Sequence, residues 1–257
     1  MTRASSPTVG ATVHPIVTPI VALDVADRSA AQAVVTRLGA SCGFYKVGLE
    51  LFAAEGPDIV SWLRDAGKSV FVDLKLHDIP NTVRGAARSV ARHGASLLTV
   101  HASGGAEMIR AAVEGAQEGA TSAAGATASG GCGILGVTIL TSMDGAGIGE
   151  AWGRDQVDVT REVVRLAGLV ATGGGAGIVC SGHEAAAVHA SFGTALGLLI
   201  PGIRLPGGDA HDQRRVMTPR AAADAGARWL ILGRAVTGAP DPVVAMEQVA
   251  ASLAGAV

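Results

Sequence analysis

Two lysines and two aspartates in neighbouring segments of the sequence have the types and spacing of a charged reaction site. The segment Ser69–Thr82 reads SVFVDLKLHDIPNT and contains Asp73, Lys75 and Asp78, while Lys46 ends the preceding apolar run. Side chains alternate along a β-strand, so Asp73 and Lys75 are expected to face the same side, with Lys46 on the same face of the neighbouring strand. Asp78 falls just beyond, in a loop. The four residues predict an alternating network of charges.

Such a network has a chemical use. Charged groups are costly to desolvate unless they pair, and pairing keeps lysines protonated and aspartates ionised. A carboxylate held between ammonium groups can be forced against a bound anion, and a fixed ammonium can deliver a proton. The alternative is a buried salt-bridge cluster that only positions strands. It is less favoured, because an apolar set would position them with less desolvation.

A second set of residues, near the C-terminal end of the chain, indicates a phosphate site. Pro201-Gly-Ile-Arg204 ends one apolar run, Gln213 follows it, and Gly233 with Arg234 ends the next. In barrels, the loops after the seventh and eighth strands often hold a phosphate through backbone amides. Gly233 offers such an amide beside a bidentate guanidinium. The segment Leu205–Asp212 is predicted to form a lid over the phosphate.

The chain must supply elements that position these residues. Short apolar runs alternate with longer amphipathic segments, which predicts parallel strands joined by crossover helices. The expected strands are Ile20–Val25, Phe44–Gly48, Ser69–Lys75, Leu97–His101, Gly133–Leu140, Gly177–Cys180, Leu196–Ile203 and Trp229–Gly233. The expected helices are Ala30–Leu38, Asp58–Ala66, Val83–His93, Ala106–Glu118, Val157–Ala171, Thr218–Ala225 and Pro242–Leu253. Eight such units in about 250 residues predict a single (β/α)8 TIM barrel of the α/β class.

A doubly wound open sheet is the alternative architecture. It would place a Gly-rich turn after the first strand, whereas Asp24–Asp27 contains no glycine. In a barrel, active sites collect at the C-terminal ends of the strands. One polar residue at a strand end can simply mark the exit into water, but a whole rim of them favours a site. The polar strand ends are Asp24, Lys46, Asp73, Lys75, His101, Thr141, Arg204 and Arg234.

Composition limits the partners and the number of domains. The 257 residues are 49% hydrophobic and 16% charged, with a formal net charge of -2, so no basic excess points to nucleic acid. No apolar run approaches the ~18 residues of a membrane helix. Residues 1–18 contain Pro7 and Pro15 and predict a flexible leader rather than a signal peptide. Residues 19–257 are expected to form one catalytic barrel domain.

Neither the histidines nor the cysteines have metal-ligand spacing. His77 is interpreted as loop structure and His101 as a hydrogen-bonding residue at a strand end. Lys46 and Lys75 would compete with a cation, so no metal is expected. Three cysteines without CxxC spacing are expected to be buried reduced thiols, which fits the cytoplasm. These are Cys42, Cys132 and Cys180.

From about Ile20 to Ala250 the sequence resembles the orotidine 5'-monophosphate decarboxylase family. The DxKxxD core is shared with related barrel decarboxylases that act on sugar phosphates, whereas the complete DLKLHDIPNT run is far more specific. The matching stretches are Val21-Ala-Leu-Asp24, Tyr45-Lys-Val-Gly48, Asp73–Thr82, Val137-Thr-Ile-Leu-Thr-Ser142, Pro201-Gly-Ile-Arg204, Gln213-Arg-Arg215 and Gly233-Arg234.

The resemblance implies a role for each matching residue. Asp24 and Lys46 would bind the ribose hydroxyls. Asp73 would sit against the scissile carboxylate, and Lys75 would protonate C6 of the pyrimidine. The other contacts would come from Thr141 (or Ser142) at the pyrimidine, Gln213 between base and phosphate, and Gly233, Arg234 and Arg204 at the phosphate.

The family also implies a homodimer with shared sites. Asp78 would complete the charged network, and Asp78, Ile79 and Thr82 would all enter the site of the partner subunit. The implied activity is metal-free and cofactor-free decarboxylation of orotidine 5'-monophosphate to uridine 5'-monophosphate, the last step of de novo UMP biosynthesis.

Two alternatives stay open: a Mg²⁺-dependent decarboxylase or isomerase of a phosphorylated sugar acid on the same barrel, and a phosphate-binding barrel without catalysis.

Overall fold

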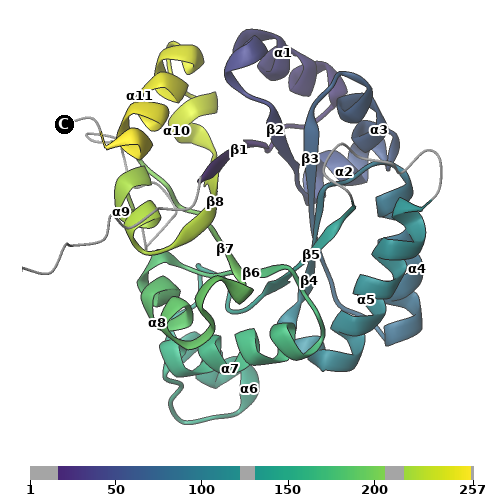
Figure 1. The fold of residues 1–257 in the computed structure, drawn as a ribbon, viewed down its shortest axis with the longest axis vertical. Helices are drawn as coiled ribbons and strands as arrows, with labels where there is room; N and C mark the ends of the chain where they lie inside the picture. The colour runs from purple at the N-terminus through teal and green to yellow at the C-terminus, as the bar shows by residue number, and fades with distance from the viewer. Residues whose placement is uncertain (1–16, 122–130, 206–216, 256–257) are drawn as a thin grey trace, which may run out of the picture.

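Parallel strands alternate with helices along the whole described chain (Figure 1). The structure is a computed structural model that describes residues 17–121, 131–205 and 217–255. The predicted leader therefore lies almost wholly outside the described residues, as do most of the predicted lid and Gln213. The division into a leader and one catalytic domain stays a prediction.

In the described residues, eight strands pair in sequence order and close into a barrel, because β8 also pairs with β1. This confirms the predicted (β/α)8 barrel and excludes the open doubly wound sheet. The strands are shorter than predicted at several C-terminal ends, since the chain leaves the ladder there to form the rim. Their bounds are β1 Thr18–Leu23, β2 Phe44–Val47, β3 Ser69–Leu76, β4 Leu97–His101, β5 Gly133–Val137, β6 Gly177–Val179, β7 Gly197–Ile200 and β8 Ala227–Leu232.

The helices surround the barrel (Figure 1). Four of them, α2, α6, α8 and α10, are absent from the expected helices above. Helix α6 has a glycine-rich sequence with low helix propensity, and it begins where the Asp144 side chain accepts a hydrogen bond from the backbone N–H of Gly147. The helices found in the described residues are α1 Arg28–Leu38, α2 Leu49–Glu55, α3 Asp58–Asp65, α4 Pro80–Arg92, α5 Gly105–Ala120, α6 Gly145–Trp152, α7 Val159–Thr172, α8 Gly182–Phe192, α9 Pro219–Asp224, α10 Arg234–Thr237 and α11 Pro242–Ala254.

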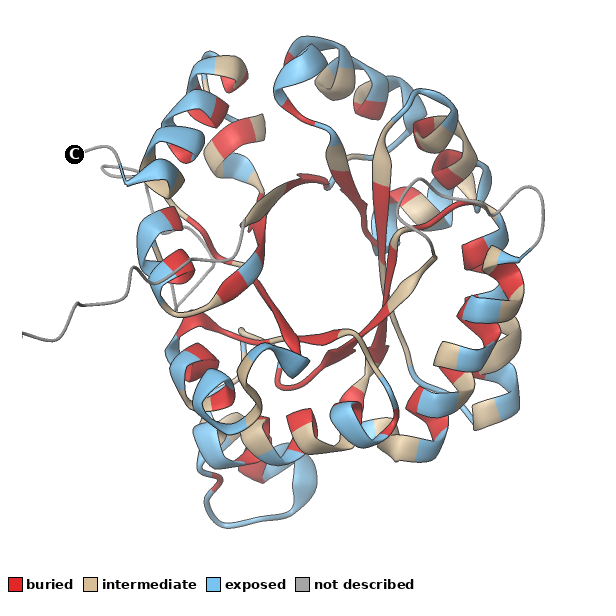
Figure 2. Cartoon of the chain, in the orientation of Figure 1, coloured by how far each residue is buried: buried red, intermediate tan, exposed pale blue. Residues whose placement is uncertain are grey.

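Two apolar layers stabilise this arrangement. One lies between the strands and the helices, so the strands and the inward sides of the helices are buried while the outward sides are exposed (Figure 2). The other fills the inside of the barrel, where alternate strand residues point. The buried members of this inner layer are Ile20, Ala22, Phe71, Leu97, Leu135, Leu199, Trp229 and Ile231.

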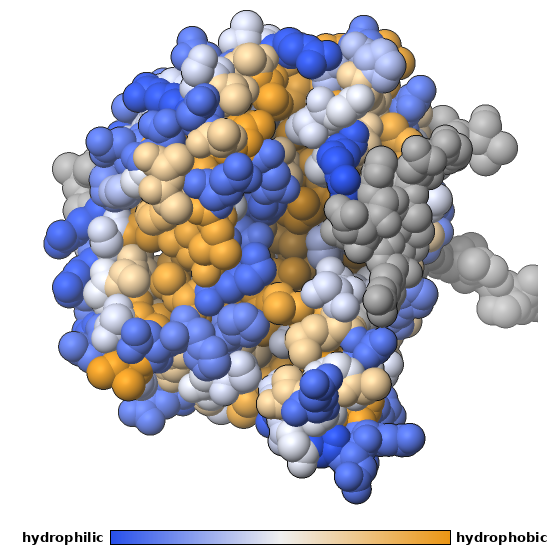
Figure 3. Space-filling view, turned by 180° about the vertical axis from the view of Figure 1, so that it is seen from behind, coloured by the Kyte–Doolittle hydropathy of each residue, from blue (hydrophilic) through white to orange (hydrophobic). Residues whose placement is uncertain are grey.

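Hydrophilic residues predominate around the edge of the face of the molecule that Figure 3 shows. Seen from the side opposite to Figure 1, hydrophobic residues gather around the middle of the face, with hydrophilic residues among them (Figure 3). Across residues 17–121, 131–205 and 217–255, no helix has both the length and the apolar character needed to cross a membrane.

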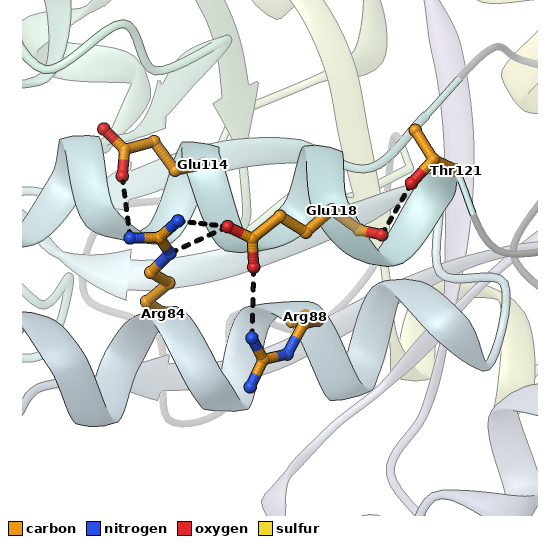
Figure 4. A network of polar contacts seen from close by, with 5 residues as sticks. All are labelled: Arg84, Arg88, Glu114, Glu118 and Thr121. Atoms are coloured by element: carbon orange, nitrogen blue, oxygen red, sulfur yellow. Dashed lines mark hydrogen bonds and ion pairs between the residues drawn. The ribbon is translucent and has the colours of Figure 1, made fainter.

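Helices α4 and α5 pack closely against each other, and α4 follows β3 in the chain. Glu118 on α5 accepts hydrogen bonds from the guanidinium groups of Arg84 and Arg88 on α4 (Figure 4). The backbones approach so closely at Gly115 that a Cβ atom there would lie 2.1 Å from the carbonyl oxygen of Arg84. Because α4 begins at Pro80, this pair directly follows the charged segment Asp73–Asp78 in the chain.

We predict that Gly115→Ala lowers the free energy of unfolding by about 1–3 kcal/mol, because the added methyl group overpacks the α4–α5 contact. Gly85→Ala on α4 is the matched control, since its Cβ would meet nothing within 4 Å. That control is expected to be neutral or to stabilise by up to about 1 kcal/mol through helix propensity. Chemical denaturation of both variants measures the difference, and equal stabilities would contradict the close-approach argument.

Candidate active site

A cavity of about 220 Å³ opens at the C-terminal ends of the barrel strands. Its floor and sides include Phe71, Val179, Leu199 and Ile231 from the inside of the barrel. Its polar lining consists of residues that the sequence predicted for the site, namely Asp24, Lys46, Asp73, Lys75 and Thr141. Five of the eight predicted polar strand ends therefore line this cavity.

Four of these side chains form a continuous line of ion pairs. Lys46 Nζ lies 2.7 Å from Asp24 Oδ1 and 3.8 Å from Asp73 Oδ2. Lys75 Nζ lies 3.0 Å from Asp73 Oδ1. The central members are the more buried, since 10% of the Lys46 side chain and 15% of the Asp73 side chain are exposed. Each buried charge therefore has a partner, as a low-dielectric site requires.

Strand register explains why the two outer strands can reach Lys46. Ala22 and Lys46 are register partners between β1 and β2, and Lys46 and Phe71 are partners between β2 and β3. Asp24 and Asp73 lie two residues beyond Ala22 and Phe71, so both carboxylates project beside the same ammonium group.

Gly48 leaves room for the first ion pair. A Cβ atom on Gly48 would lie 3.0 Å from Lys46 Nζ and 3.1 Å from Asp24 Oδ1. The φ of Gly48 is -91°, so other residues could adopt its backbone conformation. The glycine is therefore needed here for space rather than for flexibility.

The β3 strand departs from regular geometry at its charged residues. The pairing of β3 with β4 shifts between Val72 and Leu76, and Lys75 has a φ of 53°. Among the described residues, Lys75 is the one non-glycine residue with a positive φ. This left-handed conformation costs about 1–2 kcal/mol. Lys75 therefore faces the cavity through an irregular, strained backbone and not through simple alternation.

Thr99 on β4 contacts both charged residues of β3. Its hydroxyl donates to Asp73 Oδ1 at 2.9 Å and accepts from the backbone N–H of Lys75 at 2.9 Å. Its side chain is completely buried. The sequence interpretation missed Thr99 and Gly48. A hydroxyl inside the apolar run Leu97–His101 was the available signal for Thr99. The signal for Gly48 was its place in the matching stretch Tyr45-Lys-Val-Gly48, to which no role was given.

A second cavity, of about 350 Å³, lies beside the first. Asp24 and Ile231 border both cavities, so the two adjoin. The second is lined by Gly202, Arg204, Gly233 and Arg234, which belong to the segments predicted to hold a phosphate, and by Thr237, which was not predicted. Gly202 has a φ of 78°, a conformation that favours glycine.

The loop residues predicted for the site lie elsewhere. Asp78, Ile79 and Thr82 are exposed and line neither cavity. Asp78 takes part in none of the ion pairs found between described residues, and its Oδ1 accepts from the backbone N–H of Ile79 at 2.7 Å. Within one chain, the second carboxylate of the line is therefore Asp24 and not Asp78. Gln213 lies outside the described residues.

His77 and His101 lie close to each other near the C-terminal ends of β3 and β4. The rings of His77 and His101 have their centroids 5.3 Å apart. Burial, together with the nearby His77 and Lys75, lowers the pKa of His101, so its neutral form is favoured. Within the part of the chain that the structure describes, no three His, Cys, Asp or Glu side chains are grouped to hold a metal ion.

Comparison with known proteins shows which family the chain resembles. A model of the orotidine 5'-phosphate decarboxylase / HUMPS family matches residues 18–249, a range that includes both cavities. The chain is 48% identical over 236 residues to orotidine 5'-phosphate decarboxylase of Anaeromyxobacter dehalogenans, covering 90% of this chain and 96% of the relative. It is 43% identical over 234 residues to the enzyme of that name from Moorella thermoacetica, covering 91% of each.

A solved structure agrees with these sequence relatives. The crystal structure of orotidine 5'-phosphate decarboxylase from Lactobacillus acidophilus matches with a TM-score of 0.80 at 32% identity, covering 93% of this chain and 99% of that chain. The similarity therefore extends over the whole barrel.

We predict that Gly48→Ala separates Lys46 from Asp24, because the new methyl group would press on both charged atoms. A crystal structure of the variant should show the 2.7 Å contact lengthened beyond about 3.5 Å, outside hydrogen-bonding distance. Gly43→Ala, whose Cβ would meet nothing within 4 Å, is the control and should leave the pair intact. An unchanged pair in Gly48→Ala would show that the space is not needed.

Proposed function

Since the chain belongs to the orotidine 5'-phosphate decarboxylase / HUMPS family, we propose that it is a carboxy-lyase that converts orotidine 5'-monophosphate to uridine 5'-monophosphate. This reaction is the last step of de novo UMP biosynthesis. The observation that carries the proposal is the line of ion pairs from Asp24 through Lys46 and Asp73 to Lys75 at the mouth of the barrel. It places a fixed carboxylate and a fixed ammonium group side by side in a cavity that adjoins a basic one.

The two cavities divide the substrate between them. The phosphate occupies the second cavity, where Arg234 supplies a guanidinium, Gly233 supplies a backbone amide and Arg204 lies nearby. Asp24 borders both cavities, so it is placed to bind the ribose together with Lys46. The pyrimidine then lies in the first cavity, which Thr141 also lines. Gln213 bridges the base and the phosphate in this proposal.

The chemical step uses the remaining two charges. The bond between C6 and the carboxylate carbon breaks, CO₂ leaves, and the electron pair stays on C6. The Asp73 carboxylate lies against the substrate carboxylate, and their repulsion is relieved when CO₂ departs. The Lys75 ammonium stabilises the developing carbanion and then gives its proton to C6. The strained backbone of Lys75 is consistent with a side chain held for such a task.

The reaction needs neither a metal nor a cofactor in this proposal. Asp24 and Asp73, the carboxylates that line the first cavity, are already paired with Lys46 or Lys75. A divalent cation would have to displace or repel these ammonium groups, and like charges at such distances strongly disfavour each other.

Two sites shared across a homodimer complete the proposal. Asp78, Ile79 and Thr82 lie outside their own chain's cavities, yet they follow β3 directly. Ile79 is 67% exposed within one chain, so its apolar side chain is accessible to a partner subunit. In the dimer these residues reach the site of the partner subunit, where Asp78 adds its carboxylate to the charged network.

A cytoplasmic location is consistent with the cysteines. Cys42, Cys132 and Cys180 are free thiols. Burial, with a smaller effect of Glu184, raises the pKa of Cys180 to about 12, so this thiol stays protonated and unreactive. We propose that the enzyme works in a reducing compartment, where no disulfide is required.

A spectrophotometric assay tests the function directly. We predict that the protein converts orotidine 5'-monophosphate to uridine 5'-monophosphate at the same rate with and without an excess of EDTA, because fixed ammonium groups do the work of a cation. Turnover that is lost in EDTA would contradict the metal-free part of the proposal. Absence of turnover in both conditions, with nucleotide still bound, would leave a binding protein.

Mixed dimers test the shared sites. Lys75→Ala and Asp78→Ala should each abolish turnover, while Lys75→Ala still binds uridine 5'-monophosphate. In a mixed dimer, the subunit that keeps Lys75 receives Asp78 from its partner, so one of the two sites is complete. Equal mixing after unfolding and refolding should therefore restore roughly a quarter of wild-type activity. Mixtures that stay inactive, although mass spectrometry of the native protein detects mixed dimers, would exclude the shared arrangement.

A further inference from the structure

We propose that Thr99 is a positioning residue for the decarboxylation, because its one hydroxyl group orients the carboxylate of Asp73 and holds the backbone of Lys75. The inference rests on the proposed function. Thr99 does not line either cavity, so it acts through these two residues and not on the substrate.

The hydroxyl of Thr99 has a defined direction. It donates its single hydrogen to Asp73 Oδ1 at 2.9 Å, and its oxygen accepts the backbone N–H of Lys75 at 2.9 Å. A hydroxyl has one hydrogen, and a backbone N–H can only donate, so neither bond can reverse. Thr99 is 0% exposed, and water therefore cannot replace either partner.

The acceptor role replaces a missing bond of the β-ladder. β3 and β4 pair in regular register at Phe71–Leu97 and Val72–Leu98, and pairing resumes at Leu76–Val100. Three residues of β3 therefore lie opposite Thr99 alone, and the backbone N–H of Lys75 turns to the threonine hydroxyl. This bond holds Lys75 in its left-handed conformation, with φ 53°.

The donor role sets the rotation of the Asp73 carboxylate. Asp73 Oδ1 accepts from Thr99 and lies 3.0 Å from Lys75 Nζ, while Oδ2 is the oxygen nearer Lys46, at 3.8 Å. Two donors on Oδ1 define the carboxylate plane better than one. Without the Thr99 hydroxyl, the carboxylate could rotate and the Lys75 backbone could relax. The chemical step would slow, while the distant phosphate contacts would keep substrate binding intact.

Two substitutions separate the hydroxyl from the rest of the side chain. Thr99→Val keeps the shape and removes both hydrogen bonds, whereas Thr99→Ser keeps the hydroxyl and removes the methyl group. Thr138→Val is the matched control, because Thr138 is also a buried threonine, 3% exposed. Among the described residues, its hydroxyl bonds only to the backbone oxygen of Val179. If Thr99→Val does not fold, Thr99→Cys, with its weakly donating thiol, replaces it.

Steady-state kinetics should show the effect on kcat. We expect Thr99→Val to lower kcat about 100-fold, the effect of a misplacement on the order of 1 Å, with KM and the Kd of uridine 5'-monophosphate changed less than about threefold. Thr99→Ser should recover most of the lost rate, and Thr138→Val should keep the wild-type kcat. By microscopic reversibility, Thr99→Val should also slow the exchange of the C6 proton of uridine 5'-monophosphate with D₂O.

Three results would overturn the proposal. If Thr99→Val has the same kcat as Thr138→Val, Thr99 is not a positioning residue. If Thr99→Ser is as slow as Thr99→Val, the loss of rate comes from packing and not from the hydroxyl. A raised KM with unchanged kcat would indicate a binding role. If the wild-type protein does not decarboxylate the nucleotide, the proposed function fails instead. A crystal structure of Thr99→Val then still decides whether the hydroxyl holds Asp73 and Lys75 in place.

Discussion

Three ion pairs in series, from Asp24 to Lys46, from Lys46 to Asp73 and from Asp73 to Lys75, are the interaction on which the rest of the site depends. Lys46 and Asp73 are nearly buried, and a buried charge without a partner costs about 3–5 kcal/mol. Lys46 and Asp73 are each paired on both sides, so removal of either one takes a partner from the other buried charge. The site therefore behaves as a unit, and small neighbouring groups such as Gly48 and Thr99 matter because they hold the unit in one geometry.

The barrel serves this unit in two ways. Parallel pairing in sequence order brings β1, β2, β3 and β4 side by side, so charges that are far apart in sequence meet at one rim. The apolar layer inside the barrel lies directly beneath the cavity and keeps water from the lower side of the charges. On the outside, α4 and α5 pack closely against each other just after the chain leaves β3. The rim can thus carry an irregular strand without loss of the fold.

Much of this could be predicted from local patterns. Alternation of apolar runs and amphipathic segments indicated the barrel, and polar residues at strand ends indicated the rim on which Asp24, Lys46, Asp73 and Lys75 meet. The Gly- and Arg-containing segments at the ends of the last two strands indicated a phosphate site, and Arg204 and Arg234 do line one cavity there. These predictions hold because strand periodicity and chain order are properties of the sequence itself. Helices such as α6 escaped prediction because a cap and tertiary packing override weak propensity.

The sequence by itself determined which residue types end the strands, and hence that a charged rim would form. Only the tertiary structure decided which charges pair, since Asp24 and not Asp78 joins the line within one chain. It also decided that Lys75 reaches the cavity through a register shift and that Thr99 bonds to both sides of that shift. The physical reason is that alternation belongs to one strand, whereas register between strands depends on the closure of the whole barrel.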